Sequence, residues 1–91
     1  MKALSDAEVE VRRAAAEAMG GLGRSVPAAV DPLIAALADA DTEVRVMAAR
    51  ALGAVGHGSP KARKALKALA DDAAQEASVR DAANQALGAL K

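Results

Sequence analysis

The sequence predicts an all-α fold in which antiparallel pairs of helices stack along one direction. Alanine makes up 27 of the 91 residues, and Phe, Tyr and Trp are absent. This composition favours helices because Ala is the strongest helix former. In addition, one segment occurs three times, at offsets of 33 and then 35 residues, over 10–23, 43–56 and 78–91. Self-similarity at such a period indicates stacked repeats rather than a closed globule.

A second repeated segment completes the unit. Residues 33–39 (LIAALAD) match residues 66–72 (LKALADD), and each segment lies upstream of a Val-Arg segment. The unit is therefore helix A, a short turn, helix B and a turn marked by Gly. The chain is expected to form one domain over 1–91 with five main helices and about two and a half units: a partial repeat over 1–23 and repeats over 24–56 and 57–91.

Apolar periodicity predicts the B helices. Five apolar residues stand at i, i+4, i+7, i+8 and i+11, and this stripe occurs three times: Val11, Ala15, Ala18, Met19 and Leu22; Val44, Ala48, Ala51, Leu52 and Val55; Val79, Ala83, Ala86, Leu87 and Leu90. Ser5 and Glu8 have the spacing of a capping box, and Asp41 precedes the second stripe. The B helices are therefore expected over 7–22, 42–55 and 76–90.

The A helices are expected over 27–39 and 60–70. Pro32 falls inside the first of them and should bend it or delay its start, because proline lacks the N–H and crowds the preceding turn. Gly23 and Gly56 suit the left-handed residue that ends many helices.

The connection over 71–78 is longer than its counterpart over 39–43. One interpretation is a longer loop. The other is an early start of the last B helix, because Asp72 and Gln75 also have the spacing of a capping box.

These segments carry a resemblance to a known family. A helix pair of this length, with LIAALAD leading into EVRVMAARALGAVG, resembles the short HEAT-like repeats of the phycobilisome-lyase type. Ankyrin and tetratricopeptide repeats have similar periods, but their signature segments are absent from this chain. The resemblance implies a right-handed α-solenoid with the A helices on the convex side and the B helices lining the concave side.

One arginine column returns in every B segment, and so does an acidic residue near each A–B turn. The arginines are Arg12, Arg45 and Arg80, and the acids are Asp6, Asp39 and either Asp71 or Asp72. One interpretation is a line of cations that faces a ligand. The favoured interpretation is a structural ladder that ties each A–B turn to its neighbour, because both charges recur together.

Glycines also recur inside the helical pattern, at Gly20, Gly53 and Gly88. Gly in a helix interior costs roughly 1 kcal/mol relative to Ala. Its repeated occurrence therefore predicts close approach of neighbouring helices.

Three further columns differ from repeat to repeat, and their spacing places them away from the apolar stripe. They are the candidate partner-binding residues: Arg13, Val46 and Asp81; Ala16, Ala49 and Asn84; Glu17, Arg50 and Gln85. In the family that the chain resembles, these columns face the concave surface and contact a partner. The alternative is that exposed positions vary without functional meaning.

Composition excludes several functions. Twelve basic and twelve acidic residues give zero net charge, which argues against a nucleic-acid binder. There is no Cys, and His57, the single histidine, lies in a Gly-His-Gly turn without a second ligand or a catalytic partner. We therefore expect an exposed turn histidine, and no enzyme activity, catalytic residue, cofactor or metal site.

No apolar run reaches the roughly 18–20 residues of a membrane span, and the first residues lack the hydrophobic region of a signal peptide. A cytoplasmic protein without membrane or nucleic-acid partners is expected. The basic residues of the second A helix are expected to form a solvated face, because no aromatic side chains for base stacking accompany them: Lys61, Arg63, Lys64 and Lys67.

Three functions agree with these patterns. The favoured one is a non-enzymatic scaffold that binds another protein on the concave B-helix surface. The second is an accessory part of a lyase-type or repair enzyme, which rests on the resemblance alone. The third is a self-assembling unit that forms a homo-oligomer through uncapped apolar ends, since stacked repeats need polar caps to stay separate.

Overall fold

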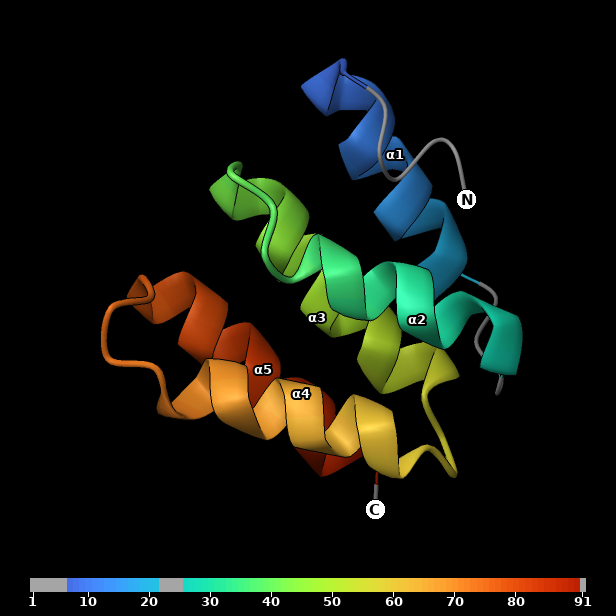
Figure 1. Cartoon of the computed structure of the whole chain (residues 1–91), viewed down its shortest axis with the longest axis vertical. Coiled ribbons are helices and arrows are strands. Elements are labelled where there is room, and N and C mark those ends of the chain that lie inside the picture. Colours follow the sequence, from blue (N-terminus) through green and yellow to red (C-terminus); the bar gives the residue numbers. More distant parts are fainter. Residues whose placement is uncertain (1–6, 22–25, 91) are drawn as a thin grey trace.

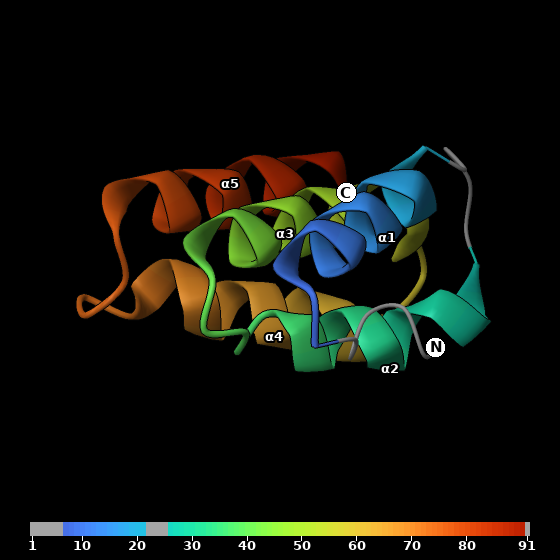
Figure 2. The ribbon, with the colours of Figure 1, turned by 90° about the horizontal axis from the view of Figure 1, so that it is seen from above.

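The computed structural model describes residues 7–21 and 26–90, which form two layers of helices. The five helices are α1 (Val9–Gly20), α2 (Pro27–Ala36), α3 (Thr42–Val55), α4 (Pro60–Asp71) and α5 (Ala77–Ala89). The B helices α1, α3 and α5 lie side by side in one layer, and the A helices α2 and α4 form the other (Figures 1 and 2). The predicted all-α fold of stacked helix pairs is confirmed.

Local sequence explains where most of these helices begin. Asp41 is the N-cap of α3, and its carboxylate accepts a hydrogen bond from the Val44 amide at 3.0 Å. Ser59 caps α4 through the Ala62 amide at 3.1 Å, and Pro occupies the first turn of α2 and of α4, where its missing N–H has no cost. Helix α1 begins at Val9 after an N-cap without a side-chain bond, later than expected. Ser5, which would complete the predicted capping box, lies outside the described residues.

The structure decides two alternatives that the sequence leaves open, the effect of Pro32 on α2 and the conformation of the connection before α5. Helix α2 begins at Pro27 and contains Pro32, so a delayed start is wrong. Helix α5 begins at Ala77, which makes the connection before it a loop rather than an extra helical turn. Inside that loop the Asp72 carboxylate accepts from the Ala74 amide at 3.0 Å. A side-chain bond two residues ahead forms a turn that competes with helix.

The core lies between the two layers, and apart from Met19 its described members are small or branched apolar side chains. Its largest fully buried members come from four helices: Leu33, Leu52, Leu66, Val44, Val55 and Val79. Among the described residues no polar or charged side chain is buried. The predicted stripe is thus buried in α3 and for the most part in α5. In α1 it is buried only in part: Met19 is buried, whereas Val11 is 40% exposed and Ala18 is exposed, because no described A helix covers this side of α1.

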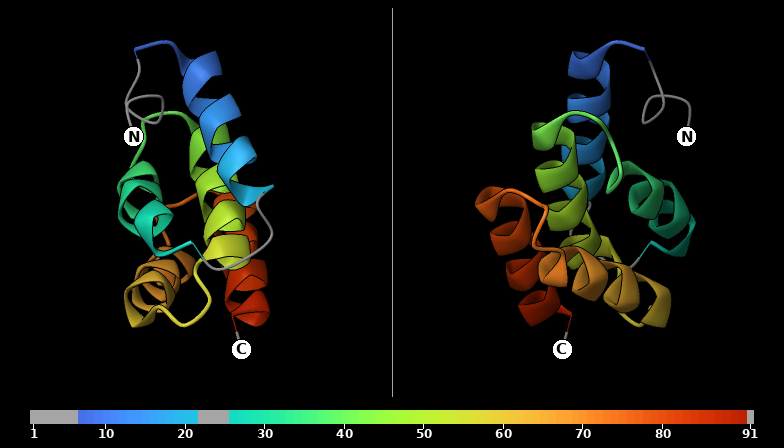
Figure 3. Two further views of the ribbon diagram at one scale, coloured as in Figure 1. Left: turned by 90° about the vertical axis from the view of Figure 1, so that its right-hand side faces the viewer. Right: turned by 60° about the vertical axis from the view of Figure 1, so that its left-hand side comes forward.

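Glycines let the B helices approach closely. A Cβ atom at Gly20 would lie 3.2 Å from the Cα of Ala51, and Figure 3 shows α1, α3 and α5 running alongside one another. At Gly53 the corresponding distance, to the Cα of Ala86, is 2.9 Å. Both contacts confirm the predicted role. At Gly88 the prediction is wrong, since no atom of a neighbouring described residue lies within 4 Å of the added Cβ.

The turn between α3 and α4 corrects one further expectation. Gly56 has a φ of −89° and is not left-handed; the left-handed residue is Gly58, with a φ of 80°. Gly56 is needed for space, because an added Cβ would lie 2.9 Å from the Cβ of Ala62 in α4 and 2.6 Å from the carbonyl oxygen of Leu52. Gly23 lies outside the described residues.

Candidate functional site

The candidate residues fall into two groups according to the way their helices are turned. We call the side of a helix that points to the next helix of its layer, in chain order, its forward face. In α5, the last helix, the forward face is the side that carries the equivalent positions of the repeat. Gly20 marks the forward face of α1 and Gly53 that of α3, because each contacts the following B helix. Helical spacing of three, four and seven residues places six candidates on forward faces: Arg13, Ala16, Val46, Ala49, Asp81 and Asn84.

Three of these six are buried, and the prediction that they form a partner-binding surface is wrong for them. Ala16 and Ala49 are fully buried, and Val46 is only 7% exposed. The reason is the close stacking within the B layer, which places them between neighbouring helices. Variation at these columns therefore reflects packing, whereas Asp81 and Asn84 are exposed on α5.

Arg13 is also held by a neighbour in the structure. Its Nε and Nη2 atoms donate to the two carboxylate oxygens of Asp41, each at 3.0 Å. This hydrogen bond raises the pKa of Arg13 and lowers the pKa of Asp41, with partial burial opposing and the Val44 amide assisting the latter shift. From the sequence, Asp41 is expected only as a helix cap, not as an ion-pair partner. The recurrence of an acid at the N-cap of each B helix, with Glu8 and Glu76 as the others, is the signal that was missed.

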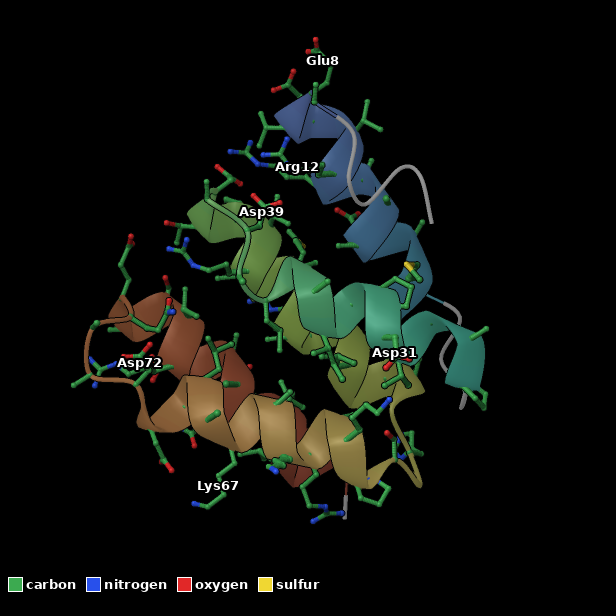
Figure 4. All side chains as sticks on the ribbon, viewed as in Figure 1. Glu8, Arg12, Asp31, Asp39, Lys67 and Asp72 are labelled. Atoms are coloured by element: carbon green, nitrogen blue, oxygen red, sulfur yellow. The ribbon has the colours of Figure 1, made fainter. Side chains whose placement is uncertain are left out.

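The first rung of the predicted ladder is confirmed. Arg12 Nε donates to Asp39 Oδ2 at 2.8 Å and its Nη2 donates to Asp39 Oδ1 at 3.2 Å, so the guanidinium of α1 bridges to the turn after α2 (Figure 4). Asp39 Oδ1 also accepts from the Asp41 amide at 2.9 Å. Arg12 thus ties α1 to the A–B turn of the following unit. Asp6 lies outside the described residues.

The second rung differs from the prediction. Arg45 donates to the Asp39 carbonyl at 2.7 Å and to Thr42 Oγ1 at 3.0 Å, and its nearest carboxylate is that of Glu76 at 3.8 Å. The longer loop before α5 causes this change, since it brings the N-cap Glu76 to the position expected for Asp71 or Asp72.

The acids expected for that rung have other contacts. Asp71 pairs with Lys67 at 3.3 Å, and Asp72 closes the turn with Ala74. The Nε atom of Arg80 is buried without a hydrogen-bond partner, so within the described residues the ladder is not continued at α5.

The remaining candidates lie along the outer side of the B layer, the side turned away from α2 and α4. We call this side the B-layer surface. Glu17 and Arg50 line a shallow groove of about 400 Å³ between α1 and α3. Arg50 and Gln85 line a second groove, of about 270 Å³, between α3 and α5. The structure therefore brings one predicted column together in a line across all three B helices.

Arg50, on the middle helix of the layer, occupies the centre of this surface. Its side chain is exposed, and no described residue forms an ion pair or hydrogen bond with it. The groove walls next to it are backbone and small side chains, including Gly20, Ala51, Gly53 and Ala86. A free guanidinium above such a floor can bind a carboxylate through two parallel hydrogen bonds.

The four basic residues of α4 are exposed, as expected for a solvated face, and three of them also contact neighbouring groups. Lys61 Nζ pairs with Asp31 Oδ1 at 3.0 Å and Lys67 pairs with Asp71. Arg63 donates to the carbonyl oxygen of Leu90. His57 lies exposed in the turn between α3 and α4. Most of the positive charge of α4 is thus engaged by neighbouring groups.

The described ranges were also searched for a metal-binding cluster and for a membrane-spanning helix. Over 7–21 and 26–90, no three His, Cys, Asp or Glu side chains come together in a way that would hold a metal ion. In the same part of the chain, no helix has the length and apolarity needed to cross a bilayer.

Comparison with known proteins identifies the repeat. A search of curated proteins found no match to the chain. The family model for HEAT repeats matches residues 1–88, which is nearly the whole sequence. This match agrees with the stacked helix pairs and with the resemblance seen in the repeated segments. The chain belongs to the family of HEAT repeats.

Proposed function

We propose that this chain is a non-enzymatic interaction module that binds another protein across its B-layer surface. HEAT repeats commonly mediate protein–protein interaction, and the match over residues 1–88 supports this class of function. The spacing of the repeats, 33 and 35 residues, further supports the short, phycobilisome-lyase type of HEAT-like repeat.

The observation that carries the proposal is the unpaired guanidinium of Arg50 between two grooves. Arg12, Arg13 and Arg45 all contact acidic groups of this chain, whereas no described residue forms an ion pair or a side-chain hydrogen bond with Arg50. The planar guanidinium of arginine forms two hydrogen bonds at once, so the side chain loses less freedom per hydrogen bond than a lysine does. Arginine is also enriched among the residues that dominate binding energy at interfaces.

The grooves beside Arg50 favour a protein segment as the ligand. Their floors contain Gly20, Ala51, Gly53 and Ala86, so a partner backbone can approach closely. Glu17 at one end and Gln85 at the other supply an acceptor and an amide for polar contacts. The helices that hold these groups are already packed, and a preformed surface lowers the entropy cost of binding.

The test is affinity capture from a lysate of the source cells, with wild type compared with Arg50→Glu. We expect a partner that the wild type retains and that Arg50→Glu loses, because the substitution places a carboxylate where the partner's acid would bind. Lys64→Glu is the matched control, since it reverses one exposed charge on α4 in the other layer. Far-UV circular dichroism confirms that both variants remain folded.

Two outcomes of this capture experiment distinguish binding at the B-layer surface from binding elsewhere. Loss of the partner with Arg50→Glu and retention with Lys64→Glu supports the B-layer surface. Equal capture by wild type, Arg50→Glu and Glu17→Lys would show that the partner binds elsewhere, and the proposed surface would be wrong.

A further inference from the structure

The two ends of the helix stack differ in their exposed side chains: charged and polar groups lie at one end, and small apolar groups at the other. We call the side of α4 and α5 that points away from α2 and α3 the α4–α5 end face. The α1–α2 end face is the side of α1 and α2 that points away from α3 and α4. Figure 1 shows these faces at the two ends of the stack. Each can be compared, position by position, with faces that meet inside the molecule.

In the B layer, positions that are apolar inside the stack become polar at the end. The forward face of α3 packs on α5 and carries Val46, Ala49 and Gly53, all buried. Thirty-five residues further along the sequence, the same three positions are occupied in α5 by Asp81, Asn84 and Gly88, all exposed. A carboxylate and an amide thus replace the valine and the alanine that form the internal contact.

The A layer shows the same change. The forward face of α2 is turned to α4, as the Asp31–Lys61 ion pair shows, and it includes Val30 and Ile34. Their counterparts 33 residues later are Arg63 and Lys67, both exposed.

These two cations lie on the open side of α4. With Lys64 they border a hollow of about 520 Å³ there. Figure 4 shows Lys67 directed away from α2. The α4–α5 end face therefore carries charge in both layers.

The opposite end face has kept small apolar residues. In α1, Ala14 and Ala18 are exposed, and they correspond to Met47 and Ala51 of α3, which border the groove against α1. In α2, Ala28 and Ala35 are likewise exposed. This face therefore carries small apolar side chains at positions equivalent to those that receive a neighbour inside the stack, without a described helix upon it.

From this asymmetry we infer that the α4–α5 pair is a polar cap, which prevents the α1–α2 end of a second copy from stacking on it. Such stacking would bury the Asp81 carboxylate against alanines that offer it no partner, and it would take the Arg63–Leu90 and Lys67–Asp71 contacts out of water. A charge buried without a partner is strongly unfavourable. The expectation of two open apolar ends is therefore wrong for this end, and the cap acts independently of the B-layer surface.

The test restores the internal sequence on the capped face. A variant with Arg63→Val, Lys67→Ile, Asp81→Val and Asn84→Ala carries on α4 and α5 the residues of α2 and α3. A contact between two different faces that does not close into a ring produces open-ended assemblies. Light scattering with refractive-index detection should show a mass that is constant with concentration for wild type and rises with concentration for the variant.

Two further variants make the result specific. Adding Ala14→Glu and Ala18→Glu to the restored variant should return the mass to the wild-type value, because the receiving face is then charged. Glu17→Val with Arg50→Ile and Gln85→Ala, on the B-layer surface, controls for added hydrophobicity. Should its mass rise as steeply as that of the restored variant, general stickiness explains the growth and the inference fails.

Two other results would overturn the cap. One is a restored variant that is folded by circular dichroism and has the mass of wild type. The other is a wild-type protein whose own mass rises with concentration and stops rising when Ala14→Glu and Ala18→Glu are introduced. Should the four-residue variant fail to fold, Asp81→Val with Asn84→Ala is measured in its place, with the same expected rise and the same overturning result.

Discussion

Gly53 in α3 lies against Ala86 in α5 so closely that a Cβ atom at position 53 would stand 2.9 Å from the Cα and 3.0 Å from the Cβ of Ala86. Real Cβ atoms do not approach a backbone atom this closely, so any side chain at this position forces the two helices apart. The contact joins the central helix of the B layer to the last one. It therefore sets the distance between two repeats.

The first prediction concerns this contact. Gly53→Ala should lower the free energy of unfolding by about 1–3 kcal/mol, the usual cost of overpacking a filled interface, even though Ala is the better helix former. Chemical denaturation followed by far-UV circular dichroism measures the change. The absence of Trp and Tyr rules out intrinsic fluorescence as the probe.

Gly88→Ala is the matched control for this prediction. It occupies the same column in α5, and its added Cβ would meet no neighbouring atom of the described part of the chain within 4 Å. The helix preference alone then acts, and stability should rise by about 0.5–1 kcal/mol. Equal effects of the two substitutions would show that close approach at Gly53 does not limit the stack.

The second prediction concerns the ion pair between Arg12 and Asp39. The two side chains are only 17% and 10% exposed and share two hydrogen bonds. A double-mutant cycle with Arg12→Met and Asp39→Asn should give a coupling energy of about 1–3 kcal/mol, the range for partners in direct contact. The Lys61–Asp31 pair, 69% and 73% exposed, serves as the control and should couple by less than about 1 kcal/mol. Similar coupling in both cycles would contradict the structural role of Arg12.

The third prediction is a pH dependence at the N-cap of α3. The hydrogen bond from Arg13, assisted by the Val44 amide, lowers the pKa of Asp41 in the folded protein below its unfolded value. Protonation therefore favours the unfolded chain. The stabilisation is fully present above the unfolded pKa of about 4 and is lost as the pH falls through the lower folded pKa.

Asp41→Asn tests this dependence, because Asn also caps helices well but carries no charge. The wild type should be more stable than the variant at neutral pH, and the difference should shrink once the pH falls below about 4. Denaturation curves across this range give the measurement. A difference that stays constant with pH would mean that the charge of Asp41 contributes nothing to stability.

Much of the fold could be predicted because it depends on local signals. The Ala-rich stripes, Asp41 at the N-cap and Pro60 in the first turn of α4 act within a few residues of the helices they specify. The repeat offset then pairs those helices without any knowledge of distant contacts. Whether the helix continues through Pro32 could not be predicted in this way, because that depends on the neighbours that support the helix around it.

The candidate surface was predicted only in part. Arg50 lies on the outside of the B layer as expected, but Val46 and Ala49, one turn or less away, are buried against α5. A helix that packs on one side shows a single apolar stripe in its sequence, and all other positions are then expected to be exposed. Helix α3 is covered on three sides, by α2, α1 and α5, so a second buried face is hidden among residues that look variable.

By itself, the sequence determined the helices, their order and their stacking as repeats, because periodicity, caps and a fixed offset are properties of the chain alone. Tertiary structure decided which side of each B helix meets its neighbour. Within the described residues it left Arg50 without an ion-pair partner, whereas Arg13 pairs with Asp41. It also turned Asp81 and Asn84 outward where Val46 and Ala49 face inward. The physical reason is that burial belongs to a pair of surfaces, and the same column of a repeat is core or solvent-facing according to whether another helix lies against it.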